Sequence, residues 1–444
     1  MNITDLQKLD LHLNWHPCSQ MKDYELFKPL VIEKAYDCYF ELSDGKKIID
    51  AISSWWCKSL GHQHPQLKNA LLKQIEKFEH VIFANTTNET IIQLSKKLTQ
   101  LSHLDKVFYV GGDGSSAVET ALKMSIHARK ILGHKNRNQF IAFKNGYHGE
   151  TIGALSVSDC GLYRKPYEKL LFDPIFIEPL YVSGINDKNW NNASDHWNVI
   201  EKILTPHQDT ATAIIFEPIV QAASGMKIYS QDFLSRICSW ARENNIHIIA
   251  DEIMTGIARC GKMLASEYAN IQPDFVCLSK GLASGWVPLS LVLTTDAIYE
   301  LFYDDYESGK SFLHSHTYSG NAIGAALALE TLNIIEKNNY CDRAIELQTI
   351  MRMSMHKIAQ KTGLIKNIRG IGAIIAADLV VGNSKDRIGF RFYQEAIRLG
   401  AFIRPLGNTI YWLPPLTISN EVLESLEEMT IQAILAASDV TNIG

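Results

Sequence analysis

Six short apolar runs of the chain lack the polar–apolar alternation of a half-buried strand. They span residues 107–110, 139–143, 212–217, 246–251, 274–279 and 289–294. Helical patterns separate most of these runs, including residues 115–132 and 231–244. Strands that are apolar throughout are typical of a sheet covered on both faces. The sequence therefore predicts an α/β fold, in which a large and mostly parallel sheet carries helices on both faces.

The 444 residues are long enough for two or three domains. Residues 30–52 predict a small sheet, because Asp44-Gly45 lies between two apolar runs and favours a β-hairpin. Helices and short strands are predicted after residue 337, near residues 341–361, 366–380, 386–399 and 409–413. We expect a large domain at residues 51–335, and a smaller α+β domain formed by residues 1–50 and 336–444.

The bulk composition excludes several classes of protein. Hydrophobic residues make up 46% of the chain and charged residues 20%, which is ordinary for a globular protein. With a net charge of -5, the chain has no global basic character that would suggest nucleic-acid binding. None of the eight cysteines forms a C-x-x-C pair, and no signal-peptide core or membrane-length apolar run occurs. We expect a cytoplasmic location, without a disulfide framework or structural zinc.

Lys280 and Asp251 each stand at the end of an apolar run. Ligands of such sheets bind at the carboxyl ends of the strands, so we expect both side chains at that edge. A lysine there can form a Schiff base with a cofactor aldehyde, and a carboxylate can hold a pyridinium nitrogen protonated. A single lysine more often reaches solvent, and a single aspartate more often caps a helix or pairs at the surface. Their shared edge favours the cofactor interpretation.

A loop rich in glycine and serine, Gly111–Ser116, follows the strand at 107–110 and leads into a helix. The start of a helix offers free N–H groups, which predicts a phosphate site with Ser115 and Ser116 as further donors. Such a loop taken alone is equally often only a turn. Tyr147 follows the strand at 139–143 and is placed to stack on a planar cofactor, although a tyrosine there more often packs on the core.

Further candidates lie outside the large sheet. Arg404 offers a planar guanidinium for a substrate carboxylate, with a surface ion pair as the alternative. The adjacent Trp55 and Trp56 belong either to the core or to a long apolar channel.

Ser315 and Thr317 precede a small-residue helix and could supply another phosphate hydroxyl. Two H-x-H pairs, His62/His64 and His314/His316, have no third ligand nearby, so no metal site is predicted.

Together these motifs resemble the class III aminotransferases of fold type I, which depend on pyridoxal 5'-phosphate. The resemblance runs from about His16 to Leu416. It rests on residues 111–116, 146–149, 217–221, 251–256 and 279–281. It implies that Lys280 carries the cofactor and moves the proton, that Asp251 binds the pyridine nitrogen, and that Tyr147 stacks on the ring.

The same resemblance implies a homodimer in which the large domain binds the cofactor. Gly114 and Ser115 would hold the cofactor phosphate, joined by Thr317 of the partner subunit.

Four further motifs resemble the branch of this class that works in biotin synthesis: Trp15-His16-Pro17, Ser53-Ser54-Trp55-Trp56, residues 61–65, and residues 403–407 with Tyr411. This branch converts 8-amino-7-oxononanoate to 7,8-diaminononanoate with S-adenosylmethionine as amino donor. The resemblance implies that Arg404 binds the carboxylate of the oxo acid. The expected substrate-binding residues are Trp55, Trp56, Tyr147, Ser315 and Arg404.

The chain departs from the usual pattern at Cys18, commonly a tyrosine, and at Glu150, commonly an aspartate. Two alternatives remain. One is another class III enzyme, such as an ω-amino acid or amine transaminase or an aminomutase. The other is a cofactor-binding regulator without turnover, which no basic segment or DNA-binding motif supports.

Overall fold

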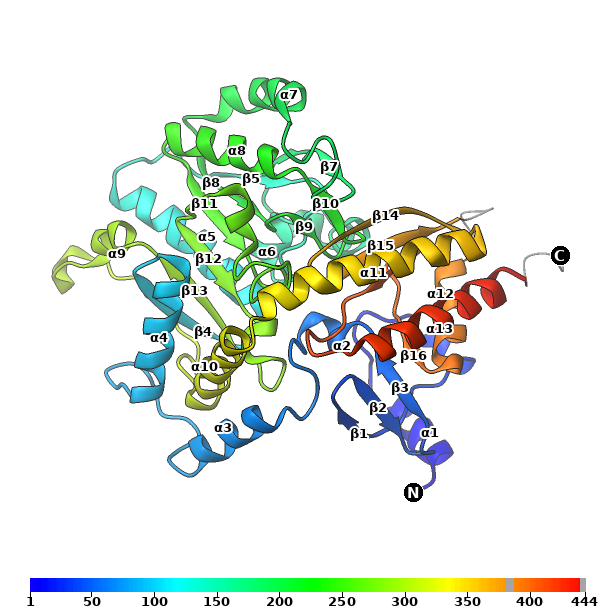
Figure 1. Ribbon diagram of the computed structural model, residues 1–444. Coiled ribbons are helices and arrows are strands. Elements are labelled where there is room, and N and C mark those ends of the chain that lie inside the picture. The colour runs from blue at the N-terminus through cyan, green and yellow to red at the C-terminus, as the bar shows by residue number, and fades with distance from the viewer. Residues whose placement is uncertain (381–386, 440–444) are drawn as a thin grey trace.

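The computed structural model describes residues 1–380 and 387–439, and a large central sheet organises them (Figure 1). Its strand order is β4-β13-β12-β11-β8-β5-β6. The strands are β4 (Lys106–Gly111), β13 (Ser290–Thr294), β12 (Phe275–Leu278), β11 (His247–Asp251), β8 (Ala211–Phe216), β5 (Gln139–Phe143) and β6 (Ile175–Ile177). From β12 to β6 all neighbours pair in parallel, whereas β13 is antiparallel to both of its neighbours. The predicted α/β fold and its six strands are confirmed, and the edge strand β6 is an addition.

Helices cover both faces of this sheet, so its strands contribute to two hydrophobic cores. One core joins α5 (Gly114–Ile131) to the sheet and contains Ile215 and Ile249. The other contains Ile214 and Ile248. It is covered by α3 (Pro65–Ile75), α4 (Glu89–Ser102), α8 (Gln231–Glu243) and α10 (Ala322–Lys337). Successive strand residues point to opposite faces, and both faces are buried, which explains the uninterrupted apolar runs.

The beginning and the end of the chain share a second, smaller sheet. Its strand order is β1-β2-β3-β16, and β16 pairs in parallel with β3. The strands are β1 (Ile32–Tyr36), β2 (Tyr39–Leu42), β3 (Lys47–Asp50) and β16 (Ala401–Phe402). The hairpin predicted at Asp44-Gly45 is confirmed, because β2 and β3 pair antiparallel around it.

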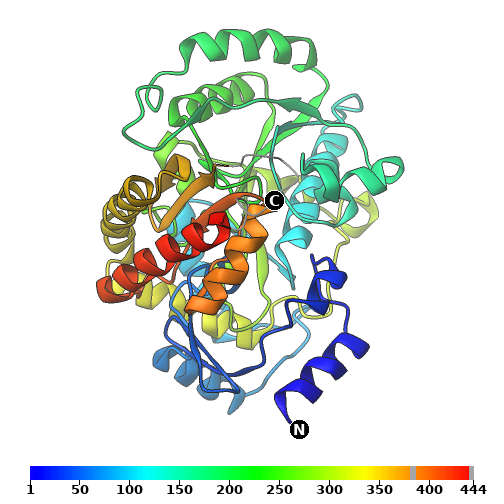
Figure 2. The same ribbon diagram turned by 90° about the vertical axis from the view of Figure 1, so that its right-hand side faces the viewer.

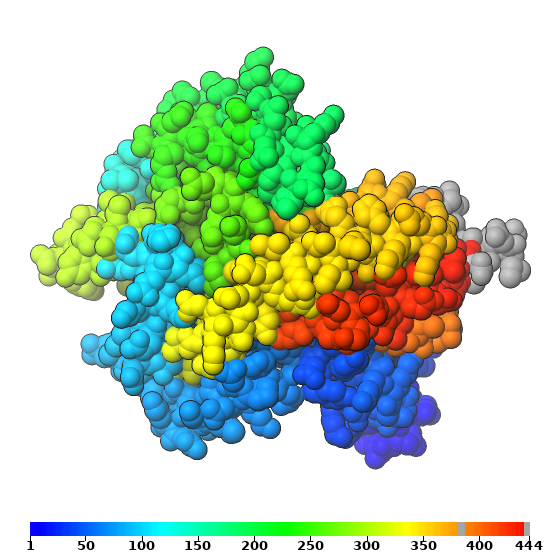
Figure 3. Space-filling view, in the orientation of Figure 1, coloured from blue at the N-terminus to red at the C-terminus, as the bar shows by residue number. Residues whose placement is uncertain are grey.

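A three-stranded sheet and three long helices make up most of the C-terminal part. They are β14 (Ile365–Ile371), β15 (Ile374–Leu379), β17 (Thr409–Trp412), α11 (Tyr340–Thr362), α12 (Ile388–Leu399) and α13 (Asn420–Asp439). Helices α11 and α13 cross one face of the molecule in a single layer (Figure 3), and α12 packs beside α13 (Figure 2). Residue 386 of the predicted helix lies outside the described residues, as do residues 381–386 and 440–444 of the predicted C-terminal domain. The domain boundaries stay a prediction.

The remaining elements are short or peripheral. They are α1 (Ile3–Leu13), α2 (Ser53–Trp56), α6 (Ile152–Ser156), α7 (Ser194–Leu204), α9 (Asp296–Phe302), and the strands β7 (Tyr181–Val182), β9 (Val220–Gln221) and β10 (Lys227–Tyr229). Within the part of the chain that the structure describes, no helix is long and apolar enough to cross a membrane.

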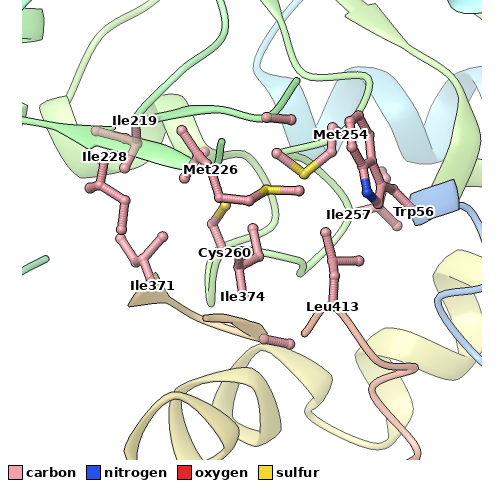
Figure 4. Packing of buried hydrophobic residues seen from close by; sticks show 14 of the residues in the cluster. Trp56, Ile219, Met226, Ile228, Met254, Ile257, Cys260, Ile371, Ile374 and Leu413 are labelled. Atoms are coloured by element: carbon pink, nitrogen blue, oxygen red, sulfur yellow. The ribbon is translucent and has the colours of Figure 1, made fainter. Parts of the chain in front are cut away.

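A continuous apolar cluster joins the C-terminal elements to the large sheet (Figure 4). Ile371, Ile374 and Leu413 come from the C-terminal part, and Met254 and Trp56 belong to the same cluster. All five side chains are at most 6% exposed. This packing fixes Trp56 against the carboxyl edge of the large sheet, where the candidate site lies.

Candidate active site

A cavity of about 280 Å³ lies at the carboxyl edge of the large sheet. Residues from the ends of β5, β8, β11 and β12, from the start of α5 and from α2 meet around it. Its lining is Trp56, Asp113, Gly114, Ser115, Tyr147, His148, Gly149, Glu150, Glu217, Asp251, Ile253, Met254 and Lys280. The fold thus brings Lys280, Asp251, Tyr147, Gly114, Ser115 and Trp56 into one cavity, which we call the inner cavity.

Lys280 follows β12 and points its amine into the inner cavity. Its Nζ lies 4.5 Å from the centre of the Trp56 ring. Burial lowers the pKa of this amine, and the carboxylates of Asp251 and Glu217 only partly oppose the shift. The backbone of Lys280 has a φ of 40°, a conformation that costs free energy and that the surrounding structure must impose. Lys280 is therefore a half-buried residue whose desolvated amine loses its proton more readily than that of an exposed lysine.

Asp251 ends β11, the strand next to β12, and forms a buried pair with His148. Its Oδ2 lies 2.8 Å from His148 Nδ1, and its Oδ1 accepts a hydrogen bond from the Ile253 N–H at 3.1 Å. The other ring nitrogen of the histidine, Nε2, is buried and has no hydrogen-bond partner among the described residues. Sequence reasoning gave His148 no role, although it directly follows Tyr147 in a turn flanked by glycines.

A second residue that sequence reasoning left without a role is Glu217, at the end of β8. Its Oε1 accepts from the Tyr147 N–H at 3.0 Å, and its Oε2 accepts from the Ala222 N–H at 3.0 Å. Burial raises the pKa of this carboxyl to about 7. Glu217 thereby anchors the turn that carries Tyr147 and His148. The signals in the sequence are its place after an apolar run, before Pro218, and its membership of the motif at residues 217–221.

Tyr147 carries its hydroxyl group to the rim of the inner cavity. The hydroxyl donates to Glu150 Oε1 at 2.9 Å. Burial, reinforced by the charge of Glu150, raises the pKa of this phenol far above its ordinary value. Tyr147 is thus a neutral hydrogen-bonding group at working pH.

The N-terminus of α5 opens onto the same cavity. Asp113 caps the helix, since its side chain accepts from the Ser116 N–H at 3.0 Å and from the Ser116 hydroxyl at 2.9 Å. The Ser116 hydroxyl is bonded to the helix cap in this structure, and its predicted role toward a phosphate stays a prediction. The Ser115 hydroxyl pairs with Thr151 Oγ1 at 2.8 Å. A Cβ on Gly114 would come within 2.7 Å of the Ile253 side chain, so the glycine keeps the first turn close to the cavity.

Trp55 and Trp56 lie on a left-handed turn. The four residues of α2 have φ angles of 51°, 46°, 69° and 76°, a conformation that costs roughly 1–2 kcal/mol per residue. Asp50 holds the turn. It accepts from the Ser54 N–H at 2.9 Å and from the Ser54 hydroxyl at 2.8 Å, and its Oδ2 lies 2.9 Å from His62 Nε2.

The two tryptophans of this turn line different cavities. Trp56 is 5% exposed, lines the inner cavity and donates from Nε1 to the Tyr411 hydroxyl at 3.0 Å. Trp55 is 42% exposed and lines a second cavity of about 690 Å³, which we call the outer cavity. The outer cavity is also lined by Arg404 and Cys18.

Arg404 forms part of the wall of the outer cavity. Its guanidinium lies 4.7 Å from the centre of the Trp55 ring, and Nη2 donates to the Cys18 carbonyl oxygen at 2.5 Å. The Trp55 ring therefore covers one face of the guanidinium, and the Cys18 carbonyl oxygen accepts a hydrogen bond from one of its N–H groups. The guanidinium still lines the outer cavity.

Ser315 and Thr317 are exposed and belong to neither cavity within the described residues of this single chain. The Thr317 carbonyl lies 3.0 Å from His80 Nε2. The neighbouring His316 packs against Gly111, where a Cβ would come within 2.4 Å of the ring. The predicted roles of Ser315 and Thr317 stay predictions.

Comparison with known proteins agrees with this geometry. The chain matches the family model for aminotransferase class-III over residues 20–434. It is 39% identical to the adenosylmethionine-8-amino-7-oxononanoate aminotransferase of Helicobacter pylori, over 94% of each chain.

Two solved structures show the same fold. The adenosylmethionine-8-amino-7-oxononanoate aminotransferase from Methanocaldococcus jannaschii superposes with a TM-score of 0.91 at 31% identity, covering 98% of this chain and all of the other. The omega transaminase from Pseudomonas jessenii in complex with PMP gives a TM-score of 0.90 at 25% identity, covering 99% of each chain. The chain belongs to the class III aminotransferase family.

Proposed function

We propose that this protein transfers an amino group from S-adenosylmethionine to 8-amino-7-oxononanoate, in biotin biosynthesis, with pyridoxal 5'-phosphate as cofactor. The observation that carries the proposal is the placement of Lys280 in the lining of one cavity with the Asp251–His148 pair. The names of the relatives, similar over nearly their whole length, supply the choice of substrates.

The residues of the inner cavity fit this cofactor. Lys280 offers the amine for its aldehyde, and Asp251 offers a carboxylate for its pyridine nitrogen. Gly114 and Ser115 at the start of α5 offer N–H groups and the positive end of a helix to its phosphate. Tyr147 supplies an aromatic wall. Pyridoxal 5'-phosphate, when bound, supplies an electron sink and a carrier for the amino group.

Each residue then has a defined task. The Lys280 amine, in its unprotonated form, takes a proton from the carbon that bears the amino group and returns one to the ketone carbon of the acceptor. Asp251, held by His148, keeps a proton on the pyridine nitrogen because its negative charge favours the protonated form. The buried Trp56 ring beside Lys280 excludes water from this exchange.

The outer cavity accommodates the rest of the substrate in this proposal. Arg404 binds the carboxylate of the oxo acid through its planar guanidinium. Trp55 lies under that guanidinium and forms an apolar wall for the alkyl chain. Because the two substrates use one site in turn, few fixed polar contacts suit both of them.

We further propose that the active protein is a cytoplasmic homodimer, in which Thr317 and Ser315 complete the site of the partner subunit. Large apolar side chains near Thr317 are exposed, with Ile82 at 63%, Tyr318 at 56% and Leu313 at 93%. The His80 contacts with Thr317 and Tyr318 join these two segments into one surface. Exposed apolar surface of this kind marks protein–protein contacts. The free cysteines of the described residues suit the reducing cytoplasm.

A single-turnover absorbance measurement tests the proposed reaction. Cofactor-loaded protein is mixed with S-adenosylmethionine, with alanine as the control donor. We expect the cofactor absorbance to change when S-adenosylmethionine is added, and to stay unchanged when alanine is added. After S-adenosylmethionine, the original absorbance should return when 8-amino-7-oxononanoate is added. A response to alanine or an ω-amine, and none to S-adenosylmethionine, would identify another class III transaminase.

Replacement of the central lysine tests the catalytic assignment. Lys280→Ala should lower turnover by a factor of about 100 to 10,000, the usual contribution of a proton-transferring group. Full retention of turnover by this variant would contradict the assignment. An exposed lysine, Lys130, provides the matched control, and its alanine variant should keep the wild-type rate.

A further inference from the structure

The amino acceptor in the proposed function, on which this inference rests, has three polar groups. They are a carboxylate at one end, a ketone, and an amine on the carbon next to the ketone. Arg404 is assigned to the carboxylate, and Lys280 acts at the ketone carbon. The amine still needs a partner, and that partner must lie close to the inner cavity.

Tyr163 lines neither cavity itself, but it contacts one lining residue of each. Its hydroxyl lies 2.7 Å from Cys18 Sγ, and Cys18 lines the outer cavity. Its ring meets the Tyr147 ring edge-on, with the centres 6.3 Å apart, and Tyr147 lines the inner cavity. Tyr163 is the last residue of a short 3₁₀ helix, Gly161–Tyr163, and is 42% exposed. Tyr163 is therefore an exposed residue that lies beside one lining residue of each cavity.

The charges around Tyr163 favour a cationic partner. Desolvation, followed by the contact with Cys18 and the negative charge of Glu150, raises the pKa of this phenol, and Arg404 opposes the shift only in part. The phenol is thus neutral at working pH, and its oxygen can accept a hydrogen bond. The Glu150 carboxylate, which accepts from the Tyr147 hydroxyl, adds a negative potential that attracts an ammonium group.

The existing partner of the Tyr163 hydroxyl is easily replaced. A thiol is a weak hydrogen-bond donor and a weak acceptor, and the Cys18 side chain is exposed. A hydrogen bond to a charged group is stronger than one between neutral groups. Exchange of the thiol for an ammonium group is therefore favourable, and Cys18 returns to the hydroxyl when the substrate leaves.

We propose that Tyr163 determines specificity for the amino acceptor, by accepting a hydrogen bond from the amine of 8-amino-7-oxononanoate in place of its contact with Cys18. Tyr163 acts on the bound acceptor and leaves proton transfer to Lys280. The donor, whose α-amine is the group removed, gains less from this contact.

A comparison of two acceptors tests the proposal. The wild type and Tyr163→Phe are assayed with 8-amino-7-oxononanoate and with 7-oxononanoate, which lacks the amine. Tyr163→Phe should lower kcat/KM for the amine-bearing acceptor roughly 10- to 100-fold, mainly through KM, as expected for a hydrogen bond to a charged group. With 7-oxononanoate, the two proteins should have equal kcat/KM, because the missing partner removes the interaction from both.

Two further readouts separate recognition from structure. The dissociation constant of 8-amino-7-oxononanoate, measured by calorimetry, should rise in Tyr163→Phe by the same factor as KM. Tyr167→Phe, on the same surface segment and 50% exposed, is the matched control and should behave like the wild type.

The outcomes distinguish this inference from the proposed function. An equal loss with both acceptors, or unchanged kinetics of Tyr163→Phe with 8-amino-7-oxononanoate, would overturn the inference alone. If the wild type has no turnover with 8-amino-7-oxononanoate, both the proposed function and this inference are wrong.

Discussion

Glu217 shows how a single buried residue links the site to the stability of the fold. Its carboxyl group has a pKa of about 7 in the folded protein, against an ordinary value of 4.5. Between these two pH values the folded state binds more protons than the unfolded chain. The free energy of unfolding therefore falls as pH rises from about 4.5 to 7, by about 3 kcal/mol at 1.36 kcal/mol per pH unit.

The glutamine variant checks this prediction. Glu217→Gln keeps the shape of the protonated side chain and cannot ionise. The free energy of unfolding of this variant should therefore not show the decrease between pH 5 and 7. Urea unfolding of both proteins across this range gives the measurement. Glu168, an exposed residue, provides the control, and Glu168→Gln should keep the wild-type slope. A wild-type slope in Glu217→Gln would assign the titration to another group.

The residues of the site differ in how far the sequence could predict them. Lys280 and Asp251 were predictable, because apolar runs located the strand ends and parallel strands end at one edge. The contact of His148 with Asp251 spans 103 residues, and no local pattern records it. Glu217 stands at a strand end like Asp251, but its carboxyl bonds to backbone N–H groups that only the folded chain brings near.

Among the elements, the left-handed turn at residues 53–56 is the one that local sequence least explains. It contains no glycine or asparagine, the residues that adopt positive φ at least cost. Long-range contacts impose it instead. Asp50 binds Ser54 and His62, and the Ser53 hydroxyl donates to the Leu413 carbonyl at 2.7 Å. By contrast, the strands of the large sheet were predictable, because burial on both faces leaves a continuous apolar run.

Removal of the Asp50 side chain should release this turn. Asp50 is fully buried, so Asp50→Ala leaves several donors of Ser54 and His62 without an acceptor. The free energy of unfolding should fall by about 3 kcal/mol or more, from a cost of roughly 1–3 kcal/mol per buried unpaired group. Chemical denaturation measures it, with the exposed Asp209→Ala as control. A loss no larger than that of the control would show that Asp50 does not hold the turn.

At the scale of the whole molecule, the proposed dimer interface is the apolar surface around Thr317. One chain has a mass of 50.0 kDa, so sedimentation should give a species of about twice that mass. Ile82→Asp places a charge in this surface and should shift the protein toward the monomer, with weaker retention of the cofactor. Val199→Asp, which changes an apolar residue 58% exposed on α7, should stay dimeric. Monomeric wild-type protein would exclude the shared site.

The parallel pairing of β16 with β3 has a consequence for how the protein is made. Residues 49–50 pair with residues 401–402, whereas the large sheet is built from residues 106–294 alone. A ribosome adding about 5–20 residues per second needs roughly 20–70 s to pass from one strand to the other. During that time the segment carrying Trp55 and Trp56 lacks its C-terminal partner strand, and the residues Asp251 and Lys280 are made before that strand. The active site of a newly made chain is therefore closed last, by the end of the chain.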